Sequence, residues 1–310
     1  MKILITGGAG YIGSTLVPKL LKQGHHVTVV DNFMYKQTSL IECCNYDNFE
    51  IIKGDVRDEK LLKPMVAEHD AIIPLACLVG APLCDKDPWT ATAVNRDVIT
   101  KIYDWKSNNQ IMIYPCTNSG YGVGEDNIHC DENTPLKPIS LYGQVKVEAE
   151  KHLLDGGEAV TFRLATVFGP SPRMRLDLLV NDFVYRAIFE NSIVLFEHHF
   201  KRNFLHVDDA ANAFIFALEN YEKLKGEPYN VGLSSANISK MELCELIKKH
   251  IPNFHIMASD IGFDPDKRNY IVSNDKIESA GFKATRDIET GIEELKKVYR
   301  IIKRDDYANI

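Results

Sequence analysis

The stretch that decides the fold is Lys2-Ile-Leu-Ile-Thr6-Gly7-Gly-Ala-Gly10-Tyr-Ile-Gly13. Its first five residues are mostly apolar and predict a short buried strand, and a helical pattern begins at Gly13. In the turn between them, Gly7 permits a tight bend, Gly10 lets a pyrophosphate approach the backbone, and Gly13 lets the helix pack closely. The free N–H groups and positive dipole of the helix N-terminus favour phosphate. The stretch therefore predicts a dinucleotide-binding turn.

Short apolar runs and longer helical patterns alternate along the first half of the chain. The runs cover residues 2–6, 26–30, 49–53, 71–75, 110–114 and 160–168, and the main helical patterns cover residues 13–23, 60–69 and 92–107. Continuous apolar runs are typical of parallel strands that are buried on both faces. The alternation predicts βαβ units, and hence an α/β fold with a Rossmann-type doubly wound parallel sheet.

The alternating pattern loosens after Gly169. An amphipathic helix is predicted at 177–190, whereas 204–220 and 229–232 contain short strands that are candidates to return to the main sheet. Further helices are predicted at 240–250 and 288–303. We expect a dinucleotide-binding domain from residues 1–168 plus 204–233, and a smaller, discontinuous mixed α/β substrate domain from 169–203 plus 234–310.

Composition narrows the class of protein. The 310 residues are 45% hydrophobic and 25% charged, which is ordinary for a globular enzyme. The net charge is -7 and no basic tract stands out, so nucleic acid is not expected as a partner. No run reaches the ~20 apolar residues of a membrane span. The 7 cysteines lack paired or zinc-binding spacing, so we expect reduced thiols, no metal, and a cytoplasmic location.

Asp31 follows the second predicted strand. A carboxylate there accepts hydrogen bonds from the adenosine ribose hydroxyls and repels a 2′-phosphate. No arginine follows within the next few residues. The predicted cofactor is therefore NAD rather than NADP.

Tyr142 and Lys146 are four residues apart in a helical pattern, which places them on one helix face. A free phenol has a pKa of ~10, and a nearby positive charge favours the phenolate. Such a tyrosine can exchange a proton with an alcohol near neutral pH. Together with the dinucleotide-binding turn, the pair predicts oxidation of an alcohol by a nicotinamide.

The chain resembles, over nearly its whole length, the extended short-chain dehydrogenase/reductase family of nucleotide-sugar epimerases, dehydratases and 4-oxidoreductases. The motifs that carry the resemblance are residues 7–13, 31–32, 54–58, 74–77, Asn95, 117–122, Tyr142 with Lys146, 163–170 and 202–208. The resemblance implies a homodimer formed through the helices at 92–107 and around Tyr142. It also implies cofactor contacts from Gly7, Gly10, Tyr11, Ile12, Gly13, Asp31, Asn32, Asp55, Val56, Leu75, Ala76, Cys77, Asn95, Tyr142 and Lys146.

The resemblance also assigns the chemistry. Thr117 is expected to donate a hydrogen bond to the substrate oxygen, while Tyr142 takes the proton and Lys146 stabilises the phenolate. Asn118 and Ser119 stand where 4,6-dehydratases of the family carry Asp and Glu, and Ser119 stands where the C3/C5 epimerases carry Cys. Dehydration and C3/C5 epimerisation are therefore disfavoured. Oxidation or reduction at one carbon, C4, remains.

Three functions stay open at this point. Within the family the chain most resembles the GDP-heptose 4-dehydrogenases of capsule heptose modification, on residues 74–84, 117–122, 172–182 and 264–270. Such an enzyme must release its NADH or reoxidise it with a second carbonyl compound such as a keto acid. The alternatives are a 4-epimerase and a catalytically silent NAD-binding redox sensor. The residues leave open the sugar, the nucleotide base and the fate of the hydride.

A nucleotide sugar carries a pyrophosphate, which requires arginine or helix N–H donors. The family places phosphate-binding arginines at Arg202 and in the segment of Arg268, and Val79 lies in a small-residue stretch where the family meets the sugar. The predicted substrate-binding residues are Val79, Asn118, Ser119, Asn181, Arg202, Arg268, Arg173 and Arg175.

Overall fold

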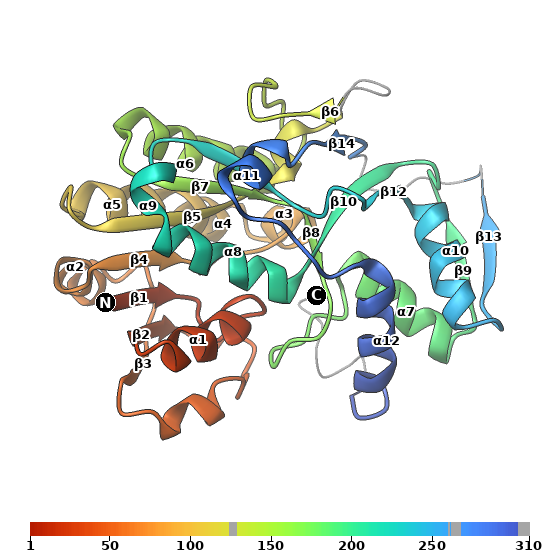
Figure 1. Cartoon of the computed structure of the whole chain (residues 1–310), viewed down its shortest axis with the longest axis horizontal. Coiled ribbons are helices and arrows are strands. Elements are labelled where there is room, and N and C mark those ends of the chain that lie inside the picture. Colours follow the sequence, from red (N-terminus) through yellow and green to blue (C-terminus); the bar gives the residue numbers. More distant parts are fainter. Residues whose placement is uncertain (124–128, 260, 262–267, 303–310) are drawn as a thin grey trace.

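The computed structural model describes residues 1–123, 129–259, 261 and 268–302, so 264–267 of the stretch 264–270 and the end of the predicted helix 288–303 lie outside the described residues. Its centre is a seven-stranded sheet in the order β11-β7-β5-β4-β1-β2-β3 (Figure 1). All six strand pairs in it are parallel. The strands are β1 (Lys2–Thr6), β2 (His26–Asp31), β3 (Phe49–Lys53), β4 (Ala71–Pro74), β5 (Ile111–Thr117), β7 (Val160–Leu164) and β11 (Pro228–Val231). The predicted α/β doubly wound class is confirmed.

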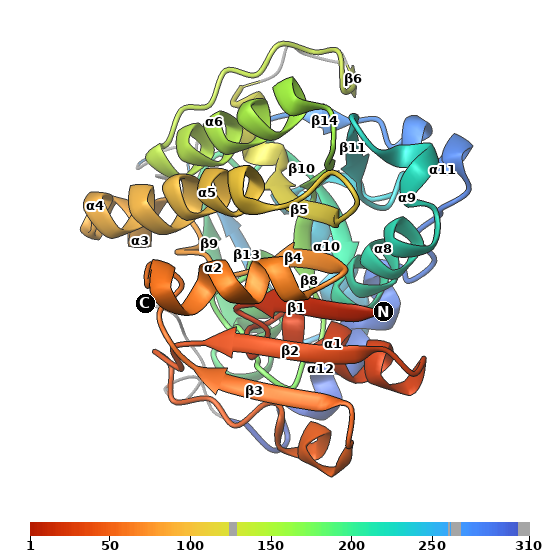
Figure 2. The same cartoon turned by 90° about the vertical axis from the view of Figure 1, so that its left-hand side faces the viewer.

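Helices cover both faces of this sheet (Figure 2). One face carries α1 (Gly13–Lys22) and α8 (Val207–Glu219), and the other carries α2 (Glu59–Glu68), α5 (Val98–Trp105) and α6 (Leu141–Gly156). Ile3 and Ile5 of β1 pack in the first cluster, whereas Leu4 packs in the second, and all three are fully buried. Because both faces are covered, the strand is apolar throughout, as the sequence predicted.

The apolar run at 160–168 forms two strands, not one. The strand β7 ends at Leu164. The N–H of the next residue, Ala165, donates to the carbonyl of Val231, and the chain then continues as β8 (Thr166–Phe168). The strand β8 pairs in parallel with β10 (Lys201–His206), and β10 pairs with β12 (Asn237–Ser239). The expected return of the 204–220 strand to the main sheet is therefore wrong, although β11 does return and α8 packs on the sheet.

The remaining elements surround these two sheets. They are η1 (Ile41–Asn45), α3 (Ala81–Lys86), α4 (Pro88–Thr92), the π-helical turn η2 (Ala93–Asp97), η3 (Asn118–Tyr121), β6 (His129–Cys130), α7 (Leu179–Phe189), β9 (Ser192–Leu195), α9 (Tyr221–Leu224), α10 (Lys240–His250), β13 (His255–Ala258), β14 (Ile271–Val272), α11 (Asp275–Ala280) and α12 (Ile288–Val298). The turn η2 interrupts the helix predicted at 92–107. Among the described residues, no helix has the length and apolarity needed to cross a membrane.

The helix α6 carries Tyr142 and Lys146 and has well-defined ends. At its start, the Ser140 hydroxyl accepts the N–H of Gly143 at 3.2 Å. It ends at Gly157, whose φ of 76° is in the left-handed region. Serine is favoured at the position before the first turn of a helix, and glycine is favoured after the last turn. The caps fix where the two side chains lie along the axis.

Candidate active site

Several of the predicted cofactor and catalytic residues lie at one edge of the main sheet. The glycine turn follows β1, Asp31 ends β2, Leu75 follows β4, and Thr117 ends β5. In a parallel sheet all carboxyl ends face the same edge, and ligands bind there at the point where the strand order reverses. Since β1 lies between β2 and β4, this point falls at the glycine turn.

The glycine turn has the form of a phosphate cradle. Gly7 has a φ of +70°, and a Cβ on it would lie 2.5 Å from the backbone N of Ala76. A Cβ on Gly13 would lie 2.4 Å from the carbonyl O of Gly8. Only glycine fits at either position. The helix α1 starts directly after the turn, and the positive end of its dipole favours a phosphate there.

Asp31 is 7% exposed and tied to the same turn. One of its oxygens accepts the N–H of Ala9 at 3.1 Å, and the other accepts the N–H of Phe33 at 2.8 Å and the Gln37 amide at 3.3 Å. Burial raises the pKa of this carboxyl above its ordinary value. A carboxylate has about four acceptor positions, so capacity remains for a ribose hydroxyl.

The loop after β4 lies directly against the turn. The N–H of Leu75 donates to the Thr6 carbonyl at 2.8 Å, and the N–H of Ala76 donates to the Thr6 hydroxyl at 3.4 Å. Asn95, on the π-helical turn, holds the next part of the loop: its amide both accepts from and donates to the backbone of Leu78, at 2.9 Å each. Asn95 therefore positions the loop, and its direct contact with the cofactor stays a prediction. The thiol of Cys77 donates to the Leu78 carbonyl at 3.4 Å.

Three further predicted cofactor residues lie at the ends of β2 and β3. Asn32 is exposed, and its side-chain oxygen accepts the N–H of Met34 at 3.0 Å. Asp55 forms an ion pair with Arg57 at 2.6 Å, and Arg57 lowers the pKa of the Asp55 carboxyl. Val56 is 8% exposed. All three stay predicted cofactor contacts.

Lys146 contacts an aromatic ring from the main sheet. Its side chain is buried, and its ammonium lies 4.1 Å from the ring centre of Tyr114 on β5. Burial raises the pKa of Tyr142 well above its ordinary value, the thiols of Cys77 and Cys116 raise it further, and the guanidinium of Arg175 lowers it. The positive charge of Arg175 therefore favours the Tyr142 phenolate in this structure, and the electron-rich face of Tyr114 holds the Lys146 ammonium. The pairing of Lys146 with Tyr142 stays a prediction.

Thr117 lies in a hydroxyl cluster beside α6. Its Oγ1 accepts the N–H of Ser119 at 3.1 Å and donates to the Ser119 hydroxyl at 3.0 Å. The guanidinium of Arg268 also donates to Ser119 Oγ. The structure thus brings three predicted residues together, with Arg268 bonded to the Ser119 hydroxyl. Asn118 is 1% exposed, and neither polar atom of its amide has a partner among the described residues.

Asn181 forms hydrogen bonds within the protein. Its side-chain oxygen accepts the N–H of Gly169 at 3.0 Å, and its amide nitrogen donates to the Arg175 carbonyl at 2.8 Å and to the Tyr11 hydroxyl at 3.3 Å. The side chain is fully buried. Asn181 therefore holds the segment around Gly169 with these bonds, and its expected bond to a phosphate stays a prediction. The Tyr11 hydroxyl, in turn, donates to the Gly169 carbonyl at 2.5 Å.

The remaining predicted substrate residues occupy different places. Arg202 is 5% exposed, donates to the Lys201 carbonyl at 2.9 Å and lies 5.7 Å from the ring centre of Tyr270. Arg175 forms a partly buried ion pair with Asp177. Val79 is half-buried in the loop after β4.

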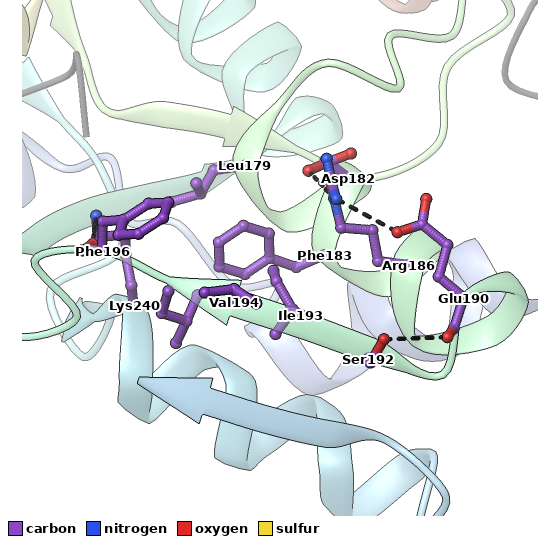
Figure 3. Close-up of a pocket in the computed structure, with 11 residues that line it drawn as sticks. Leu179, Asp182, Phe183, Arg186, Glu190, Ser192, Ile193, Val194, Phe196 and Lys240 are labelled. Carbon is purple, nitrogen blue, oxygen red and sulfur yellow. Dashed lines mark hydrogen bonds and ion pairs between the residues drawn. The ribbon is translucent and has the colours of Figure 1, made fainter. Parts of the chain in front are cut away.

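A cavity of about 520 Å³ lies between α7 and β9 (Figure 3). Phe183, Leu179 and Phe196 supply apolar walls. Arg186 forms ion pairs with Asp182 and Glu190, which also line the cavity. Within the described residues, β9 pairs only with β13. None of these residues was predicted from the sequence to bind a ligand, because their spacing is typical of an ordinary amphipathic helix followed by a strand.

The model of the NAD dependent epimerase/dehydratase family matches residues 3–232. The chain belongs to this family. NAD is therefore its cofactor, and the protein is an NAD-dependent enzyme of oxidoreductase type. The glycine cradle, where no Cβ fits at Gly7 or Gly13, and the acceptor capacity of Asp31 suit the pyrophosphate and ribose of that cofactor.

Curated relatives in this family are about a quarter identical to the chain. CDP-paratose 2-epimerase of Salmonella typhi is 27% identical over 90% of this chain and 93% of its own length. A putative UDP-glucose 4-epimerase of Methanocaldococcus jannaschii is also 27% identical, over 94% of this chain and 95% of its own length. The solved UDP-glucuronic acid 4-epimerase of Bacillus cereus, in complex with UDP-glucuronic acid and NAD, superposes with a TM-score of 0.85 at 23% identity, covering 97% and 100%. This last similarity establishes the fold of the family.

Proposed function

We propose that this protein oxidises C4 of a nucleotide-activated sugar with NAD and releases a 4-keto sugar for polysaccharide biosynthesis. One observation carries the proposal: Thr117 and Tyr142 lie at the sheet edge that holds the glycine cradle, and the neighbours Asn118 and Ser119 lack a carboxyl group. Elimination of water requires an acid and a base beyond those needed at C4. This site offers hydroxyls and a phenol, which suit proton transfer at a single oxygen.

NAD, when bound, supplies the acceptor for the hydride that leaves C4. Tyr142 takes the proton of the C4 hydroxyl, so its phenol must first be deprotonated. Burial opposes that ionisation, and the positive charge of Arg175 favours it. The cluster of Thr117 and Ser119 donates a hydrogen bond to the same substrate oxygen. The amine of Lys146 lies against the ring of Tyr114, on the same helix as Tyr142.

We assign the nucleotide base to the cavity between α7 and β9. Aromatic and aliphatic walls suit the flat face of a base, and the polar side chains in the lining suit its edge. Arg202 and Arg268 would then bind the phosphates and the sugar between this cavity and Thr117. Residues 169–203 plus 234–310 form the substrate-binding part in this assignment.

The finer proposal is a GDP-heptose substrate for capsule heptose modification. It comes from the resemblance at 74–84, 117–122 and 172–182. We also propose that the enzyme is a homodimer in the cytoplasm. Because net oxidation leaves NADH on the enzyme, we include a keto acid as a hydride acceptor. A 4-epimerase would instead return the hydride to the other face of the ring.

A panel of GDP-, UDP-, CDP- and dTDP-sugars, incubated with the purified protein and NAD, tests the proposal. We expect a GDP-heptose to lose the mass of two hydrogens, and added keto acid to raise the number of turnovers. The Tyr142→Phe variant serves as the control and should bind NAD without turnover. A product of unchanged mass and altered stereochemistry would identify an epimerase, and no turnover of any sugar would favour the redox sensor.

A further inference from the structure

The segment 171–177, which follows β8, lies against the glycine turn. The Ser171 hydroxyl donates to the Tyr11 carbonyl at 2.6 Å and lies 2.9 Å from the hydroxyl of Ser14. The backbone N–H of Arg173 donates to Ser14 Oγ at 3.2 Å. These bonds join the segment to the turn and to the first turn of α1. The segment therefore runs beside the place where the phosphates of a dinucleotide bind.

Arg173 is the residue of this segment that reaches the adenosine side of the site. Only 5% of it is exposed, and its guanidinium lies 4.6 Å from the ring centre of Tyr35. Tyr35 belongs to the loop that begins at Asp31, the carboxylate expected to hold the adenosine ribose. The positive charge of Arg173 favours ionisation of Asp31 and so lowers its pKa, against the raising effect of burial.

Arg173 has a second guanidinium close by. Its own guanidinium donates to the Met174 carbonyl, while Arg175 forms an ion pair with Asp177. Burial lowers the pKa of Arg173, and the positive charge of Arg175 lowers it further, whereas Tyr35, Asp177 and Asp31 raise it. A buried guanidinium beside a second one is stabilised by a phosphate, whose oxygens match its planar fork of donors.

We infer that Arg173 binds the pyrophosphate of NAD from its adenosine side, with Tyr35 orienting the guanidinium and the segment 171–177 lying over the dinucleotide. This assigns Arg173 to the cofactor and removes it from the candidates for the nucleotide sugar. Arg175 lies further along the same segment, near Tyr142, toward the nicotinamide end. The assignment depends on the cofactor of the family and not on the identity of the sugar.

The test measures nucleotide binding without any sugar. Calorimetric titrations of nucleotide-free protein use NAD, ADP-ribose, adenosine and GDP, for the unchanged chain and for Arg173→Gln, Arg173→Lys and Arg300→Gln. Arg300 is exposed just after α12, so its variant controls for the loss of one positive charge. For Arg173→Gln we expect NAD and ADP-ribose to bind about 10- to 100-fold more weakly. Adenosine, which has no phosphate, should bind as before.

Arg173→Lys keeps the charge without the planar fork, so we expect an intermediate loss. Melting temperatures without ligand show whether each variant is folded. If Arg173→Gln is not folded, the NAD affinity of Arg173→Lys tests the assignment. Three results would overturn the assignment: unchanged NAD affinity in a folded variant, an equal loss for adenosine, or a loss for GDP with none for NAD. Failure to oxidise any sugar would leave the assignment intact, because these titrations contain none.

Discussion

The ion pair between Glu150 and Arg163 gives the sharpest prediction about what holds the catalytic helix. Glu150 is one turn after Lys146 on α6, and its carboxylate accepts from Arg163 Nε at 2.9 Å and from the Thr161 hydroxyl at 2.9 Å. The two side chains are only 2% and 6% exposed. Arg163 also donates to the Tyr121 hydroxyl at 3.1 Å, so the pair joins α6 to β7 and to the turn after Thr117.

Removing one partner of this pair leaves a buried charge without its counterion. Burial lowers the pKa of Arg163, but Glu150 and Tyr121 raise it more, so the guanidinium stays charged in the native protein. Glu150→Leu should therefore reduce the free energy of unfolding by about 3–5 kcal/mol. That corresponds to a fall in melting temperature on the order of 5–15 °C. Glu150→Leu combined with Arg163→Met should recover most of the loss, because no buried charge then remains.

Urea and thermal unfolding of the two single variants and the double variant measure these differences. The control is Asp155→Asn, which breaks the ion pair between Lys151 and Asp155 one turn further along α6. Those side chains are 73% and 65% exposed, so the change should cost less than about 1 kcal/mol. The reasoning is wrong if Glu150→Leu costs no more than this control. It is also wrong if the double variant loses the sum of the two single losses.

Three further predictions concern the site itself. Tyr142→Phe should keep NAD affinity, seen by calorimetry, and reduce kcat by about 10²- to 10⁴-fold; a kcat near that of the unchanged protein would move the proton transfer to another residue. Burial raises the pKa of Asp31. During acidification its carboxylate is therefore protonated earlier, at a higher pH, than that of an ordinary aspartate. NAD affinity should therefore weaken on acidification, and Asp31→Asn should bind NAD more weakly at neutral pH and lose this dependence; an unaltered pH profile in the variant contradicts the assignment. Arg202→Ala should raise the KM for the nucleotide sugar much more than the Kd for NAD, and equal effects on both would count against a phosphate-binding role.

Features that depend on local periodicity could be predicted from the sequence. The strands β1 and β3, the helix α10 and the glycine turn lie where the apolar spacing placed them. These elements have strong signals because a strand buried on both faces needs a continuous apolar run. The division of 160–168 at Ala165 could not be predicted, because both resulting strands are apolar and only their partners differ.

Features that depend on side-chain orientation or distant pairing were not predictable in this way. Helical spacing puts Lys146 on the same face as Tyr142, but it does not reveal that the Tyr114 ring, from another strand, holds the ammonium. The contact between Ser119 and Arg268 joins residues 149 positions apart. The amide of Asn181 has the right chemistry for a phosphate, yet the backbone of Gly169 and Arg175 already uses it. Each of these outcomes depends on tertiary packing.

The late return of β11 to the main sheet has a consequence for how the chain matures. One edge of β7 pairs with β11, which is synthesised only after β8, β9, β10 and α8. Until residues 228–231 have left the ribosome, β7 presents an open row of backbone donors and acceptors that another nascent chain can pair with. Truncated products ending before Pro228 should therefore accumulate in insoluble aggregates, while a chain long enough to supply β11 closes that edge by itself.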